Sequence, residues 1–78
     1  MADQYVRLQK IQPGLYNVFA RSSGKRIGLV RRVENRWCGQ VLLYTRAGHP
    51  TNRMRSLSGV FGSRRDAASE VWVQNDAP

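Results

Sequence analysis

Segments in which apolar and polar residues alternate, separated by turn-forming residues, dominate the first half of the chain. Residues 5–12 alternate over most of their length and end at Pro13-Gly14. An alternation with a period of two places the apolar side chains on one face of a β-strand, and a Pro-Gly pair is typical of a turn. This stretch is therefore predicted to form one strand of an antiparallel sheet.

Three further strands are expected at residues 15–20, 26–33 and 37–44. The breaks between them, 22–25 and 33–36, are rich in residues that favour turns, and Asn35 is expected to adopt a positive φ. Strands joined by such short connections pair as antiparallel neighbours. Residues 16–44 are therefore predicted to form a meander.

The alternating pattern is lost over residues 45–56, which contain Arg46, Arg53 and Arg55. Because this stretch has no hydrophobic period, it is predicted to be a flexible basic loop. A short final strand is expected at residues 57–61.

A helix of about residues 63–73 is predicted next. Ser63 and Asp66 have the spacing of a capping box, in which the first side chain accepts a hydrogen bond from the backbone N–H of the third helical residue. The polar tail, residues 74–78, is expected to fray. One stripe of the helix is expected to pack on the sheet, and it consists of Ala67, Ala68, Val71 and Trp72.

These elements predict an α+β fold, an antiparallel β-meander of four to five strands with one C-terminal α-helix packed on one face. At 78 residues and 8.9 kDa, the whole chain (1–78) is expected to be a single small domain. Its one cysteine, Cys38, excludes an internal disulfide, so stability must come from packing. No apolar run approaches the roughly 18 residues of a membrane span. Because no secretory signal is recognisable either, a cytoplasmic location is expected.

The charge of the chain is strongly basic. There are 13 Lys and Arg residues against 5 Asp and Glu residues, giving a net charge of +8 and a pI near 11.1. Between Arg21 and Arg65 the only acid is Glu34. If the meander is sheet-like, these cations are expected to share one broad surface that attracts phosphates. The predicted partner is therefore a nucleic acid, with double-stranded DNA favoured and RNA as a sub-case, and DNA binding would place the protein at the nucleoid.

The reactive side chains predict no enzyme, no cofactor and no metal site. Asp66 and Glu70 are the only acids close to one another, and their i and i+4 spacing puts them on an exposed helical face. His49 lies in the predicted loop without a partner, and Cys38 has neither a second cysteine nor a nearby histidine. Tyr44, at the mouth of the loop, is the best candidate for stacking on an unpaired base, with a purely structural rim position as the other interpretation.

Part of the chain resembles a known family of DNA-binding domains. Residues 57–71, Leu-Ser-Gly-Val-Phe-Gly-Ser-Arg-Arg-Asp-Ala-Ala-Ser-Glu-Val, resemble the last strand and helix of the plant ethylene-response-factor (Apetala-type) domain. Upstream, Val30-Arg-Arg and Arg36-Trp-Cys-Gly-Gln-Val41 are similar to the first two strands of that family. The arm-binding domain of phage-type tyrosine recombinases is similar too, with a three-stranded sheet and a helix. The resemblance covers residues 29–72.

The resemblance implies a sheet laid into the major groove of DNA, with the helix behind it. Trp37, Gly39 and Val41 would then face the helix, while Leu42 and Leu57 would point outward, where the family tends to place an arginine and a tryptophan. The residues that the resemblance implies as DNA contacts are Arg31, Arg32, Arg36, Gln40 and Arg55. The predicted basic loop adds Arg46 and Arg53 as candidate contacts. The first turn of the helix adds Arg64 and Arg65, because a phosphate bound at this positive end of the helix dipole would offset the cost of placing cations there.

Residues 5–20, which the family lacks, leave two arrangements open. If they fold over the sheet, Leu42 and Leu57 become core, and the basic loop is the remaining candidate for phosphate contact. If they extend the sheet edgewise, its face stays open, and the contiguous meander favours this arrangement. The alternative function is a protein interaction module, such as a phage-type regulator or an inhibitor of a larger host machine. It would bind an acidic partner through a sheet edge or through exposed Leu42 and Leu57.

Overall fold

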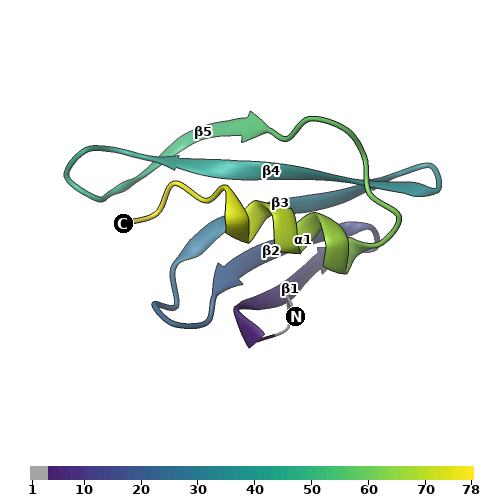
Figure 1. Ribbon diagram of the computed structural model, residues 1–78, viewed down its shortest axis with the longest axis horizontal. Helices are drawn as coiled ribbons and strands as arrows, with labels where there is room; N and C mark the ends of the chain where they lie inside the picture. Colours follow the sequence, from purple (N-terminus) through teal and green to yellow (C-terminus); the bar gives the residue numbers. More distant parts are fainter. Residues whose placement is uncertain (1–3) are drawn as a thin grey trace.

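Five antiparallel strands lie side by side in the order in which they occur along the chain, and one helix packs across them (Figure 1). The computed structural model describes residues 4–78. The strands are β1 (Val6–Gln12), β2 (Leu15–Ala20), β3 (Arg26–Val33), β4 (Arg36–Tyr44) and β5 (Pro50–Ser56), and the helix is α1 (Arg64–Val73). The predicted α+β meander with a C-terminal helix on one face is confirmed.

The N-terminal strand settles whether residues 5–20 cover the sheet or extend it. β1 pairs with β2 at the edge of the sheet, so this segment extends it. Val6 is paired with Ala20, and both are buried in the core, whereas the intervening Arg7 is exposed. Because neighbouring residues of a strand point to opposite faces, β1 adds apolar residues to the core and polar residues to the other face.

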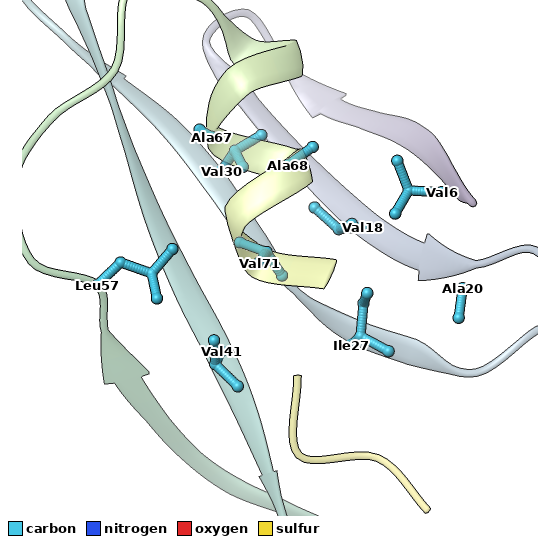
Figure 2. Packing of buried hydrophobic residues seen from close by; sticks show 10 residues of the cluster. All are labelled: Val6, Val18, Ala20, Ile27, Val30, Val41, Leu57, Ala67, Ala68 and Val71. Atoms are coloured by element: carbon cyan, nitrogen blue, oxygen red, sulfur yellow. The ribbon is translucent and has the colours of Figure 1, made fainter. Parts of the chain in front are cut away.

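The core lies between the sheet and α1 (Figure 2). A bulge between β2 and β3 turns Ile27 toward the core, where it joins Val30 of the same strand. The predicted helical stripe packs here, although half-buried Trp72 lies at its margin, stacked on Tyr5 with 4.5 Å between ring centroids. The side chains with no exposed surface are Val18, Ile27, Val30, Val41, Ala67, Ala68 and Val71.

Helix α1 is stabilised at both ends by side chains. Ser63 is the N-cap, and its hydroxyl oxygen accepts a hydrogen bond from the backbone N–H of Asp66 at 3.1 Å, as the capping box predicts. At the other end, the guanidinium group of Arg55 donates to the backbone oxygen and to the side-chain oxygen of Gln74, both at 3.2 Å. A cation at this position complements the negative end of the helix dipole.

The prediction of a flexible basic loop at residues 45–56 is wrong for most of its length. Residues Pro50–Ser56 form β5, which pairs with β4, and only 45–49 form the connecting turn. In that turn His49 is held through its backbone N–H, which donates to the hydroxyl oxygen of Thr45. β5 shows no hydrophobic period because it is an edge strand whose side chains are mostly exposed, and its backbone pairing holds it in place.

The predicted strand at residues 57–61 is also wrong. This segment leaves the sheet after Leu57, and Phe61 makes an isolated bridge with Trp37 through two backbone hydrogen bonds of 2.8 and 2.9 Å. Leu57 is buried in the core, with only 8% of its surface exposed, so it does not point outward. Two of the apolar residues that suggested a strand, Leu57 and Phe61, instead pack on the core and hold the segment that connects β5 to α1.

Two local predictions need correction. In the turn between β3 and β4, Glu34 has the positive φ, at 57°, and Asn35 does not. The tail at residues 74–78 is docked and not frayed, because a carboxylate oxygen of Asp76 accepts the backbone N–H of Tyr44 at 2.7 Å and Ala77 packs against the core. This contact satisfies a backbone donor at the end of β4. Within residues 4–78, no helix has the length and apolar character needed to cross a membrane.

Candidate nucleic-acid interface

The two faces of the sheet differ in what covers them. Helix α1 lies over one face, mainly against β3 and β4 (Figure 1). The segment between β5 and α1 runs on the same side, since Leu57 and Phe61 contact the core, and so does the tail through Ala77. Among the described residues, no segment therefore crosses the opposite face, which we call the open face.

Strand pairing places polar and apolar side chains in rows across the open face. Arg7, Phe19 and Arg26 form one row from β1 to β3. Leu29 in β3 is paired with Asn17 on one side and with Gln40 on the other. The residues that form the open face are Arg7, Gln9, Leu15, Asn17, Phe19, Arg26, Leu29, Arg31, Val33, Arg36, Cys38, Gln40, Leu42, Met54 and Ser56.

The cationic and amide groups of this face have incomplete partners within the protein. The guanidinium carbon of Arg7 lies 4.4 Å from the ring centroid of Phe19, which leaves the N–H groups of that arginine available for another ligand. Asn17 donates to the side-chain oxygen of Gln9 at 3.3 Å, while its own side-chain oxygen is buried without a partner. The Nε of Arg26 is buried without a partner as well.

The acids in the described part of the chain lie outside the strands that form the open face. None of the five strands contains an Asp or Glu. Among the described residues the acids are confined to the β3–β4 turn, the helix and the tail, and Asp3 lies outside the described residues. The acids in the described part of the chain are Glu34, Asp66, Glu70 and Asp76. The potential over the open face is therefore set by arginines without compensating carboxylates.

The predicted contact residues do not all share one surface. Arg31, Arg36 and Gln40 lie on the open face, on the two central strands β3 and β4. Arg32 points to the helix side, because it is paired with the core-packed Trp37. The remaining predicted residues lie elsewhere, with Arg46 in the β4–β5 turn, Arg53 and Arg55 on edge strand β5, and Arg64 and Arg65 in the first turn of α1.

Two of these arginines are engaged in contacts that hold the fold together. Arg55 caps the C-terminal end of α1, as described above. The guanidinium carbon of Arg64 lies 4.7 Å from the ring centroid of Tyr16, and the same group donates to the hydroxyl oxygen of Tyr16 at 2.9 Å. The expectation that the cations share one surface is therefore wrong, because they are divided between the open face and the helix side.

Sequence reasoning missed several members of the open face, including the polar residues Arg7, Gln9, Asn17 and Arg26. The signal for the first two was present, since they alternate with the apolar residues of 5–12. It becomes informative only once this segment is known to extend the sheet. Arg26 was hidden by the bulge at Ile27, which shifts the alternation in β3.

The two leucines on which the protein-docking alternative relied are both buried. Leu42 lies on the open face, yet only 3% of its surface is exposed, and Leu57 belongs to the core. Leu42 lines a cleft together with Arg26 and Tyr44. The sheet edges remain as the docking surface for that alternative.

Tyr44 lies beside Leu42 and is linked to β3. Its hydroxyl group donates a hydrogen bond to the backbone oxygen of Arg26 at 2.5 Å. Burial raises the pKa of this hydroxyl above its ordinary value of 10.0, and the positive charge of Arg26 opposes the increase in part. The group therefore stays a hydrogen-bond donor throughout the physiological range.

The side chains that could bind a metal ion do not gather at one place in the described part of the chain. Residues 4–78 contain no group of three or more His, Cys, Asp or Glu residues placed to hold a metal ion. Comparison with protein-family models, with characterised proteins and with solved structures finds no match to this chain. The likeness to ethylene-response-factor domains and to the recombinase arm-binding domain therefore stays a prediction.

Proposed function

We propose that this protein binds nucleic acid, and double-stranded DNA in particular, through the open face of its sheet. The observation that carries the proposal is the composition of that face: arginines and side-chain amides project from adjacent strands, and the strands contain no carboxylate. Arginine forks bind phosphates or the O6/N7 edge of guanine through paired hydrogen bonds, and amides bind adenine edges. The helix supports the sheet from behind and makes no contact with DNA.

The dimensions of the sheet decide which strands enter the groove. Strands are about 4.8 Å apart, so five of them span about 19 Å, whereas the major groove of B-DNA is about 12 Å wide. Only the central strands fit within it. Arg31, Arg36 and Gln40 on β3 and β4 therefore face the bases, while Arg7 on edge strand β1 meets the flanking phosphates.

A matched pair of double variants tests this assignment. Arg31→Ala with Arg36→Ala removes two open-face cations, whereas Lys10→Ala with Arg32→Ala removes two exposed cations from the helix side. Both variants lose the same charge. The free energy of unfolding of each should lie within about 0.5 kcal/mol of the wild-type value, because these side chains are exposed. Any difference in DNA affinity between the two variants therefore reports location and not net charge.

The measurement is fluorescence anisotropy with a labelled DNA duplex at salt concentrations from about 50 to about 200 mM. The open-face variant should bind about tenfold more weakly. Because these two arginines face the bases, its slope of log K against log salt should stay close to that of the wild type, which reports the phosphate contacts. The helix-side variant should keep both the wild-type affinity and the wild-type slope. Equal losses in both variants, or a flat salt dependence of the wild type, would contradict the proposal.

A further inference from the structure

A cleft of about 410 Å³ opens at one end of the open face, where the start of β3 meets the end of β4 and the start of β5. We call it the Leu42 cleft. Its volume lies in the range of small-molecule sites, which are usually about 300 to 1,000 Å³. The residues that line it are Lys25, Arg26, Leu42, Tyr44, Gly48, Pro50, Thr51 and Asn52.

One wall of the cleft is suited to an anion. Lys25 and Arg26 are adjacent in the chain and both line the cleft, and its lining contains no acid. The Nε of Arg26 is buried and has no hydrogen-bond partner among residues 4–78. A buried donor without an acceptor is costly, so an anion that provides acceptor oxygens to this guanidinium group would be favoured.

The floor of the cleft is suited to a flat apolar group. Leu42 contributes little surface, because only 3% of it is exposed, so the accessible apolar group is the half-buried ring of Tyr44, which is fixed by the hydrogen bond from its hydroxyl to the backbone oxygen of Arg26. At the rim, the exposed side chain of Asn52 offers both a donor and an acceptor. An inorganic phosphate would leave this floor unused, and the two cations would repel a positively charged ligand.

We propose that the Leu42 cleft holds one unpaired nucleotide of a nucleic-acid strand. Its phosphate binds Lys25 and Arg26, its base lies against the ring of Tyr44, and Asn52 contacts the edge of the base. This inference rests on the proposed function, since the cleft continues the open face at which we place the DNA. It adds a preference that the open face alone does not produce: a duplex with an unpaired end binds more tightly than a fully paired one.

The test compares a blunt duplex with the same duplex carrying a short single-stranded overhang, titrated against the full chain. A 2-aminopurine base in the overhang reports contact with Tyr44 through a change in fluorescence. The wild type should prefer the overhang probe about tenfold, the effect of one base stacked on an aromatic side chain. Lys25→Glu should remove the preference, whereas Lys10→Glu, an equal charge reversal on the helix side, should weaken both probes alike and keep it.

Each result decides between the two proposals. Equal affinity of the wild type for both probes would overturn the Leu42 cleft as a nucleotide site and leave DNA binding by the open face intact. A preference that survives Lys25→Glu would also overturn it. Failure of the wild type to bind either probe would overturn both proposals.

Discussion

Two glycines beneath α1 set how closely the helix approaches the sheet. A Cβ atom at Gly28 would lie 2.2 Å from the backbone oxygen of Gln40 and 2.6 Å from a methyl group of Val71. At Gly39 the nearest atom would be a terminal methyl of Leu57, at 2.7 Å. A side-chain methyl can move, whereas the backbone of a central strand cannot. The two positions therefore differ in how well they tolerate a side chain.

Alanine substitutions measure this difference. Gly39→Ala should destabilise the protein by about 1 to 3 kcal/mol, the usual cost of overpacking, and Gly28→Ala should cost more because it forces β3 and β4 apart. Gly62→Ala is the control, since no atom lies within 4 Å of its Cβ position. Urea unfolding gives all three free energies. A Gly28→Ala variant as stable as the control would show that the helix does not pack as described.

The hydroxyl group of Tyr44 makes stability depend on pH in the alkaline range. Its raised pKa means that the folded protein holds this proton more tightly than the unfolded chain does. The resulting contribution to stability is complete at neutral pH. It declines as the pH rises above about 10, where the unfolded chain loses the proton first.

Substitution of this tyrosine gives the measurement. Tyr44→Phe should cost about 1 kcal/mol at neutral pH through the lost hydrogen bond to Arg26. It should also remove a component that titrates above pH 10 from the ultraviolet absorbance of the folded protein. An unchanged titration curve would rule out the buried, hydrogen-bonded hydroxyl.

At the scale of the elements, the start of α1 depends on one side chain. Ser63→Ala removes the acceptor for the backbone N–H of Asp66 and should destabilise the protein by about 1 kcal/mol. Ser63→Asp should restore most of this loss, because its carboxylate accepts the same hydrogen bond and complements the helix dipole. Thermal unfolding of the three proteins provides the comparison. Equal stability of all three would show that this cap does not stabilise the helix.

The elements that sequence patterns predicted are those with their own periodic signal. The strands β1 to β4 and the helix α1 each carry apolar residues at the spacing of their secondary structure, and their predicted positions match the structure closely. β5 has no such signal, because it is formed by backbone pairing at a sheet edge and its side chains are polar on both faces. The apolar residues at 57–61 produced the opposite error, since they enter the core without forming a strand.

At the scale of the whole molecule, the net charge predicted a polyanionic partner but could not predict where the charges lie. Arg31, Arg36 and Gln40 were identified from their strand positions, and the structure places them together on the open face. Arg55 and Arg64 were assigned the same role. Arg55 instead caps the C-terminal end of α1, and Arg64 stacks on the ring of Tyr16. These contacts join segments far apart in the chain, so no local pattern reveals them.

The central claim, that the open face is the nucleic-acid interface, is tested most directly by side-chain NMR signals during titration with a short DNA duplex. The account predicts that the side-chain amide signals of Gln9, Asn17 and Gln40 shift as DNA is added. It also predicts that the amide signal of Gln74 and the indole N–H signal of Trp72, both on the helix side, keep their positions. Shifts confined to Gln74 and Trp72, or no shift of any of these signals at saturating DNA, would contradict it.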